Sequence, residues 1–596
     1  MSDFTTRPEI RGTFGVVTST HWLASSVGFG VLEKGGNAFD AAVATAFALQ
    51  IVEPHLNGPA GDMPAILHTA ETGETKVLCA QGVSPAAATV KAYTDQGLSL
   101  VPGSGLLATV VPGAFDGWLM MLRDHGTMSL REVLQPAIDY ARDGHPILPR
   151  VANTIADLQE FFETEWPTSA AVWSPDGQAP APHALFRNPD LARTYDRLAE
   201  VADTAGGDRR AQIDAARAEW REGFVAQAIF DYLKDASVMD VSEKKHSALL
   251  APSDMADWRA TYEETLTLDY HGWTVHKTHA WSQGPVMLQA LSILKNFDLG
   301  AMDPDGAEFV HTVIEAMKLA YADREAYYGD PDYSEIPMEH LLSDAYGAER
   351  AKLIDTTASM DQRPGRVPGF EHLADAYLAR SVQDFGVEGV AAQEPTMAHL
   401  TEKRGDTVHL DVIDRWGNMV AATPSGGWLQ SSPVIPGLGF PLNSRAQMFW
   451  LTDGLPTSMA PKRRPRTTLT PSFAEKDGAR LVFGTPGGDQ QDQWNLIWFL
   501  RFVHHGLGLQ QGMDAPLFHT MHFQGSFFPR EVKPGEMMME PAFDAQVIDS
   551  LRARGHIVTV SEPWAVGRLT AAMREADGML RAAATPRLMQ AYAVGR

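Results

Sequence analysis

Hydrophobic residues in the first two thirds of the chain recur mainly at helical spacing. The spacing predicts helices over 23–32 and 38–52, with Asn37 as the N-cap of the second and Pro54 beyond its end. Further helices are predicted over 128–144 and 307–328. The Pro/Ala/Ser-rich stretch Trp166–Pro189 and the charged stretch Thr204–Arg217 interrupt this pattern and are interpreted as surface insertions.

The loop "HLNGPAGD" at 55–62 leads from the second helix into a strand predicted over Ala65–His68. A glycine-rich loop between regular elements is typical of positions close to a functional site. A tight connection without function explains the composition equally well, and the sequence leaves both interpretations open.

After Asp406 the pattern changes to strands. Residues 407–414 alternate, with Val408, Leu410 and Val412 on one face, and Gly417-Asn418 predicts a turn into a return strand over 419–423. This order predicts stacked layers of helix and sheet. Later strands and helices are predicted over 480–485, 556–560 and 567–575 and over 492–506 and 543–555, respectively.

Composition narrows the class of protein. The 596 residues are 44% hydrophobic and 21% charged, as in ordinary globular proteins. The net charge of −25 argues against nucleic acid or an anionic membrane as a partner. With no signal-like N-terminus and no long apolar run, the expected location is the cytoplasm. The single cysteine, Cys79, excludes an intramolecular disulfide and is interpreted as a buried structural thiol.

The sequence lacks the common metal and phosphate motifs, H-E-x-x-H, paired C-x-x-C and the P-loop, and it lacks G-x-S-x-G. His311 and Glu315 lie four residues apart on a predicted helix. They would suffice for half a metal site, but a solvated pair on the helix surface is the favoured interpretation. We therefore expect neither a metal nor an organic cofactor.

Thr407 stands where the polar run ends and the strand begins. Inside a chain, a threonine is a poor nucleophile. If the preceding peptide bond is cut, Thr407 gains an α-amine with an unperturbed pKa of about 8, which is a competent base beside its own hydroxyl. The alternative is a structural threonine, because threonine favours strands.

The motif "GDTVHLDVIDRWGNMVAAT" resembles the segment around the nucleophile of the γ-glutamyltransferase family. The resemblance extends over nearly the whole chain, in the order of the family. It includes "GVVTSTHWLASSVGFGVLEKGGNAFDAAVATAFALQIVEPHLNGPAGD", "EAMKLAYADREAYYGDPDY", "PLNSRAQMF", "RRPRTTLTPSF" and "GTPGGD".

This resemblance implies an α+β fold, the four-layer αββα sandwich of N-terminal-nucleophile hydrolases. It implies that a precursor cuts itself between Asp406 and Thr407, into a large subunit of residues 1–406 and a small subunit of residues 407–596 that stay packed as one unit. Thr407 then matches the nucleophile, Ser425 a hydroxyl that hydrogen-bonds it, and Gly487-Gly488 the donors to the oxyanion. His409 fits the pattern with a structural role.

The chain departs from the family at the positions that clamp a γ-glutamyl group. Gln81 stands where an arginine is expected, Gly427 where an asparagine is expected, and Thr467-Thr468 in place of two serines. The segment "LNSRAQMF" offers Arg445, with Met448 where the acid for the substrate α-amine would be. An ammonium beside Arg445 would be unfavourable, whereas a carboxylate would be held well. Arg445 would equally suit an internal ion pair.

The sequence thus predicts an enzyme, an amidohydrolase or acyltransferase for a small amide that bears a carboxylate, such as a glutaryl-like or short dicarboxylic monoamide. Water or an amine would resolve the acyl-enzyme. One alternative is a γ-glutamyl hydrolase or transpeptidase of glutathione metabolism. Others are an uncleaved, inactive scaffold and a solute-binding module. The oligomeric state stays open, a homo-oligomer included.

Overall fold

Two seven-stranded sheets form the centre of the molecule. The computed structural model describes residues 4–382 and 407–596. One sheet has the order β1-β20-β19-β15-β14-β11-β10, and the other β21-β2-β12-β13-β3-β4-β9. The strands of the first sheet are Ile10–Gly12, Leu580–Ala584, Thr570–Arg574, Ala479–Gly484, Ser472–Lys476, Trp273–Lys277 and Leu266–Tyr270. Those of the second are Tyr592–Gly595, Gly15–Ser19, Leu410–Asp414, Met419–Ala422, Met63–Thr69, Glu74–Ala80 and Thr261–Glu263.

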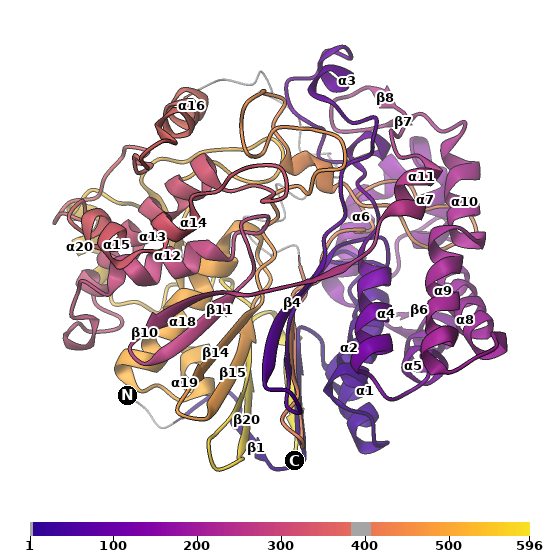
Figure 1. The fold of residues 1–596 in the computed structure, drawn as a ribbon, viewed down its shortest axis with the longest axis horizontal. Helices are drawn as coiled ribbons and strands as arrows, with labels where there is room; N and C mark the ends of the chain where they lie inside the picture. The colour runs from indigo at the N-terminus through magenta and orange to yellow at the C-terminus, as the bar shows by residue number, and fades with distance from the viewer. Residues whose placement is uncertain (1–3, 383–406) are drawn as a thin grey trace.

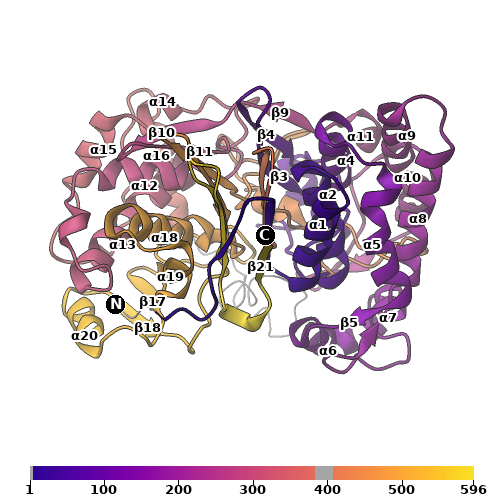
Figure 2. The same cartoon turned by 90° about the horizontal axis from the view of Figure 1, so that it is seen from below.

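The sheets pack face to face, and helices cover both outer faces (Figures 1 and 2). A cluster of buried apolar side chains that includes Ile66, Ile413, Phe473 and Val482 fills the space between the sheets. One outer core lies under α1, α2, α4 and α5, and the other under α12, α13 and α18. The predicted four-layer αββα sandwich is confirmed. These helices are Trp22–Glu33, Ala38–Val52, Ala114–His125, Leu130–Asp143, Pro285–Leu294, Ala307–Tyr327 and Gln491–His505.

Each sheet draws strands from both sides of position 407. In the second sheet, β12 lies between β2 and β13, and the C-terminal strand β21 pairs with β2. In the first sheet, β11 pairs with β14 and β1 with β20. Residues before and after 407 therefore share their cores and form one folded unit.

Most local predictions are confirmed, because periodicity and capping specify these elements. Asn37 caps α2 in a full capping box with Asp40. The hairpin of β12 and β13 turns at the predicted Gly417-Asn418. Strand β18, Ile557–Val560, and helix α20, Ala545–Ala553, also lie where the pattern places them.

The two predicted surface insertions are wrong. Within the first, Trp166 precedes helix α7, Pro167–Trp173, and Trp173 is its last residue, and both indoles are buried. Residues 209–217 of the second belong to helix α9, Arg209–Arg221, in which Arg217 is buried and donates to both oxygens of Asp116 at 2.9 and 3.0 Å. The sequence predicts an exposed charge at Arg217, but in the fold this charge is buried and is neutralised by Asp116, which lies far away in the sequence.

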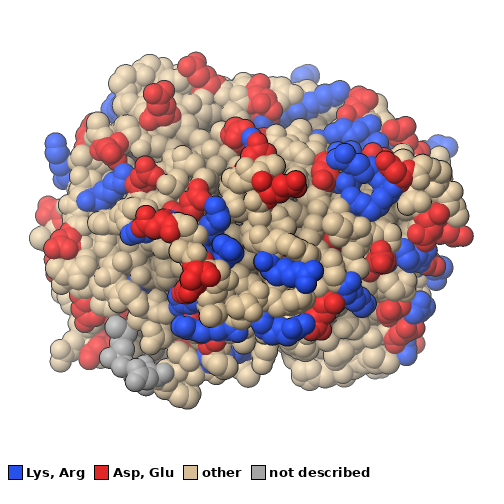
Figure 3. Space-filling model, turned by 60° about the horizontal axis from the view of Figure 1, so that its bottom comes forward, with Lys and Arg blue, Asp and Glu red and all other residues tan. Residues whose placement is uncertain are grey.

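The surface mixes charges of both signs. Figure 3 shows Lys and Arg interspersed with Asp and Glu over one face of the molecule. On this face, the net charge of −25 does not appear as a continuous acidic surface. Among the described residues, no helix has the length and apolar character needed to cross a membrane.

Candidate active site

Three strand ends meet at one edge of the second sheet. Thr407 lies three residues before β12, Ser425 follows β13, and Asp62 directly precedes β3. Because these neighbouring strands run antiparallel, the start of one lies beside the end of the next. Ser425 forms β-bridges to both Thr407 and Asp62, and it exchanges backbone hydrogen bonds with Asp62 at 2.7 and 3.0 Å.

The Thr407 side chain is fully buried at this edge. Its hydroxyl donates to Ser425 Oγ at 3.3 Å, and Gln491 Nε2 approaches Thr407 Oγ1 at 3.5 Å. Arg568 Nη2 donates to the Thr407 carbonyl at 3.4 Å. The structure thus brings together the predicted pair Thr407 and Ser425. The predicted partner in cleavage, Asp406, lies outside the described residues.

Gly487 and Gly488 reach the same place from the first sheet. They follow β15 and open the short helix η4, Gly488–Gln490, which runs directly into α18 and Gln491. Their φ angles, 131° and 56°, lie in the region that only glycine enters freely. The segment therefore lies at the N-terminal end of α18, where peptide N–H groups and the helix dipole favour negative charge.

The two sheets approach closely beneath Thr407. A Cβ at Gly484, the last residue of β15, would lie 2.1 Å from the His409 ring. His409 hydrogen-bonds Thr423 Oγ1 at 2.8 Å and Asp411 Oδ1 at 2.9 Å. All these side chains are buried, and they fix the strand that carries Thr407. The contacts agree with the structural role expected for His409.

A buried ion pair lies beside Ser425. Arg445 Nε donates to Asp62 Oδ2, and Gln81 Nε2 approaches Asp62 Oδ1 at 3.3 Å. Desolvation raises the pKa of Asp62, and the guanidinium opposes part of that rise. Among the described residues, Arg445 Nη2 has no hydrogen-bond partner, although it is buried. The sequence identified Arg445 and Gln81 but missed Asp62, the last residue of the glycine-rich loop.

The backbone around Gly427 is packed against that loop. Gly426 and Gly427 have φ angles of 77° and 65°. A Cβ on Gly426 would lie 3.2 Å from Asp62 Oδ2 and 3.5 Å from Arg445 Nη2. The loop 55–62 therefore packs directly against the residues of the candidate site. Met448 and Trp428 flank Arg445, with the guanidinium 5.1 Å from the centre of the Trp428 ring.

Thr467 and Thr468 lie at a different contact. Thr467 N donates to the Trp281 carbonyl at 2.8 Å, and Thr468 Oγ1 is buried without a partner among the described residues. None of their hydrogen bonds within residues 4–382 and 407–596 joins them to Thr407 or Arg445. Cys79 is buried as predicted, and desolvation raises the pKa of its thiol to about 12.

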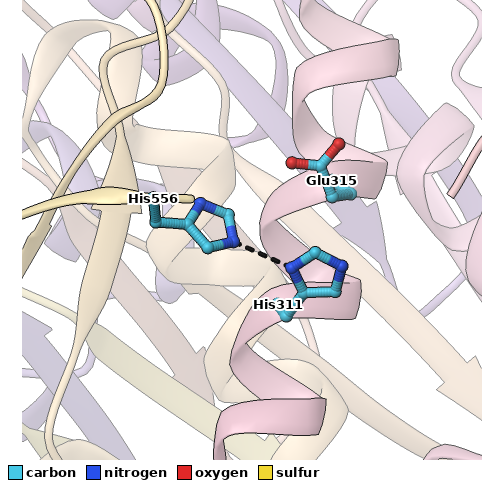
Figure 4. A group of neighbouring side chains, drawn as sticks. All are labelled: His311, Glu315 and His556. Carbon is cyan, nitrogen blue, oxygen red and sulfur yellow. Dashed lines mark hydrogen bonds between the residues drawn. The ribbon is translucent and has the colours of Figure 1, made fainter. Parts of the chain in front are cut away.

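The interpretation of His311 and Glu315 as a solvated pair is wrong. Both are buried on α13, and His556, which precedes β18, faces them (Figure 4). His311 Nδ1 and His556 Nε2 lie 2.8 Å apart, and burial lowers the pKa of both imidazoles. These three residues are the group, among the described residues, whose ligand atoms lie close enough for a metal. However, Lys318 and Arg363 already occupy the two oxygens of Glu315. A cation there would face two positive charges.

The fold and this edge of the sheet define a hydrolase or transferase of the N-terminal-nucleophile type. The chain belongs to the γ-glutamyltranspeptidase family, since the family model described as gamma-glutamyltranspeptidase matches residues 24–595. It is 29% identical over 583 residues to the glutathione hydrolase-like YwrD proenzyme of Bacillus subtilis, with 97% of each chain covered.

The chain is also similar over nearly its whole length to a further curated relative and to a solved structure. The chain is 28% identical over 588 residues to the oxamate amidohydrolase proenzyme of Klebsiella pneumoniae, covering 96% of this chain and 97% of the other. The solved structure of LmbA2991HD has a TM-score of 0.91 and 52% identity, with all of each chain covered. Other matching relatives are named acylase ACY 1 proenzyme and glutathione hydrolase proenzyme.

Proposed function

We propose that the protein is a self-processing amidohydrolase that uses Thr407 as its N-terminal nucleophile. Cleavage of the Asp406–Thr407 bond would give a large subunit, 1–406, and a small subunit, 407–596. The new α-amine would take the hydroxyl proton as Thr407 Oγ1 attacks an amide carbonyl. The contact between Thr407 Oγ1 and Ser425 Oγ supports this, because Ser425 can orient the attacking oxygen. Relatives named as proenzymes are consistent with processing.

The remaining steps follow from the same geometry. The developing oxyanion would lie at Gly487-Gly488, where the end of α18 favours negative charge. The C–N bond then breaks, and the leaving amine takes the proton held by the α-amine. Water, or an acceptor amine, attacks the resulting ester and frees Thr407.

The observation that supports a carboxylate-bearing substrate is a difference within the buried ion pair: among the described residues, Asp62 has hydrogen-bond partners for both its oxygens, whereas Arg445 still has a donor to offer. Both oxygens of Asp62 already accept hydrogen bonds, from Arg445 and Gln81. Arg445 Nη2 has no such partner within residues 4–382 and 407–596. A substrate carboxylate would accept a hydrogen bond from Arg445 Nη2, whereas a substrate ammonium would have to compete with Arg445 and Gln81 for the oxygens of Asp62. Oxamate, named for one relative, is itself the monoamide of a dicarboxylic acid.

The second candidate is a γ-glutamyl hydrolase or transpeptidase, and Asp62 favours it. The sequence placed no acid beside Arg445, but the large-subunit part supplies one. Gln81, Gly427, Thr467 and Thr468 would then shape the pocket for a γ-glutamyl group, as at the matching family positions.

A substrate panel separates the two candidates. Glutaryl p-nitroanilide, γ-glutamyl p-nitroanilide and butyryl p-nitroanilide differ only in the groups that Arg445 and Asp62 would contact. We expect kcat/KM to be highest for the glutaryl compound. Arg445→Gln should lower that value about 10- to 100-fold, the range for losing a charged hydrogen bond, and should affect the butyryl compound much less. Faster turnover of the γ-glutamyl compound would favour the second candidate, and no turnover of any would favour a scaffold.

A further inference from the structure

A second group of buried arginines lies near Asp489, the residue that directly follows Gly488. Arg324, Arg380, Arg466 and Arg530 converge on two carboxylates, Glu325 and Asp489. They come from the end of α13, from α16 (Glu371–Ser381), from the segment before β14 and from the loop after β16 (Phe518–Thr520). All six side chains are buried.

The two carboxylates neutralise two of the four guanidiniums. Arg324 pairs with Asp489 and, at 2.8 Å, with Glu325. Arg466 Nη2 lies 2.6 Å from Glu325 Oε1, and its Nη1 donates to Ser526 Oγ at 2.7 Å. Ser526 in turn donates to Asp489.

Among the described residues, the hydrogen bonds of the other two guanidiniums go only to neutral backbone carbonyls. Arg380 Nη2 donates to the Glu325 backbone carbonyl at 3.0 Å. Arg530 Nη2 donates to the carbonyls of Gln447 and Phe449 at 2.7 and 3.1 Å. Both stack on the Trp450 ring, at 4.5 and 4.1 Å from its centre. Arg530 Nη1 is buried without a partner there.

Carbonyl dipoles and an aromatic face do not neutralise a buried charge, so the cluster, as far as the structure describes the chain, carries an excess of positive charge. Desolvation lowers the pKa of Arg530 to about 9, and desolvation with the nearby Arg324 lowers that of Arg466 to about 10. An unpaired buried cation is costly to a fold. An anion placed against Arg530 Nη1 would remove this cost and complete a charge-assisted hydrogen bond.

The cluster is joined to the candidate active site through two short elements. Asp489 directly follows Gly488 in η4, and Gln491, two residues on, contacts Thr407. The helix η3, Arg445–Met448, carries Arg445 and also Gln447, whose carbonyl accepts from Arg530. Trp428, Met448 and Phe527 form an apolar contact between Arg445 and the 526–530 loop. Arg445 and Arg530 thus meet the same short helix, and each has a terminal guanidinium nitrogen that is buried without a partner among the described residues.

We propose that Arg530, supported by Arg466, binds a second carboxylate of the substrate, on the leaving-group side of the scissile amide. The substrate class is then a dicarboxylic acid joined by one carboxyl to an amino acid. Arg445 would hold the acyl carboxylate and Arg530 the carboxylate of the departing amino acid. This inference rests on the proposed function and names its substrate class.

The kinetic test uses two substrates that differ by one charge, glutaryl-glycine and glutaryl-glycinamide. For the wild-type protein, we expect kcat/KM to be about 10- to 100-fold higher for glutaryl-glycine, mostly through KM. Arg530→Gln should abolish this ratio. Arg587→Gln is the matched control, because Arg587 is buried but pairs with Glu540 and has two carbonyl partners. It should keep the ratio. Equal turnover of both substrates by the wild-type protein, or a ratio unchanged in Arg530→Gln, overturns the proposal.

A measurement of thermal stability with malonate, a dicarboxylate probe, does not depend on turnover. Malonate should raise the Tm of the wild-type and Arg587→Gln proteins more than that of Arg530→Gln, in which Arg445 alone would be left to bind it. In buffer without malonate, Arg530→Gln should melt no lower than the wild type, because it loses an unpaired charge, whereas Arg587→Gln should melt lower. Equal malonate effects in all three proteins, or a Tm loss in Arg530→Gln like that of Arg587→Gln, overturn the proposal. Malonate binding without turnover of any amide would separate a failure of the proposed function from a failure of this inference.

Discussion

The buried pair of Asp62 and Arg445 gives the sharpest test of the geometry beside Ser425. The two side chains are 0% and 1% exposed. Removing one member leaves the other buried and unpaired, which costs about 3–5 kcal/mol. Unfolding entropy of about 2 cal/mol/K per residue implies a Tm loss of about 2–4 °C if the interleaved sheets unfold together. We expect this loss in both Asp62→Leu and Arg445→Met.

The two variants should respond differently to pH. In Arg445→Met, Asp62 keeps its burial but loses the cation, so its pKa, already raised by desolvation, rises further. Its folded pKa then lies above the unfolded one, so stability is present at low pH and is lost as pH rises through the folded pKa. Asp62→Leu removes the titrating carboxyl group itself, so its deficit should not vary in this way.

The double variant Asp62→Leu/Arg445→Met completes the cycle. It removes both charges together and should recover most of the lost Tm, because an apolar replacement of a buried pair is close to neutral. Differential scanning calorimetry at pH 5.5 and 8.0 measures all four proteins. Single variants that melt within about 1 °C of the wild type, against the about 2–4 °C expected, would refute the pairing of Arg445 with Asp62.

Three further predictions concern titration, reactivity and the hydroxyl pair. Burial lowers the pKa of His519 and His21 to about 3, so the unfolded chain binds more protons, and stability should be lost as pH falls from 6.5 toward 3. Denaturant titrations at pH 5.0 and 6.5 should show a loss of about 1.4 kcal/mol per pH unit for each such histidine, and equal stability would contradict it. Because the pKa of Cys79 is raised to about 12, iodoacetamide at pH 8 should label the folded protein at least about 100-fold more slowly than the unfolded protein, as followed by mass spectrometry. Ser425→Ala should lower kcat about 10- to 100-fold through loss of its contact with Thr407, whereas the control Ser242→Ala, in the loop between β7 (Val238–Met239) and β8 (Lys245–His246), should leave kcat unchanged; equal kcat values would argue against an orienting role.

Sequence patterns predicted the strands and helices well, because their signals are local. Asn37 and Asp40 specify a helix start within four residues, and Gly417-Asn418 specifies a turn between two alternating strands. Helix α9 was missed for the opposite reason. Arg217 is buried only because Asp116, 101 residues earlier, accepts from it.

Sequence motifs predicted some residues of the candidate site, but they did not predict residues that join it only through contacts between distant segments. Thr407, Ser425 and Gly487-Gly488 lie in recognisable segments. The partner of Arg445 lies 383 residues away, in a loop whose composition indicated a site but not which residue would matter. No sequence pattern indicated the excess charge at Arg530 either, because the four arginines of this cluster come from four separate segments that meet only in the fold.

Intact mass spectrometry of freshly purified protein, beside a Thr407→Ala variant, shows whether the chain cuts itself before Thr407. Self-processing should give two fragments that meet between Asp406 and Thr407 in the wild type and a single full-length mass in the variant. A wild-type mass that stays at the full length of 596 residues on incubation would contradict self-processing and the N-terminal nucleophile together.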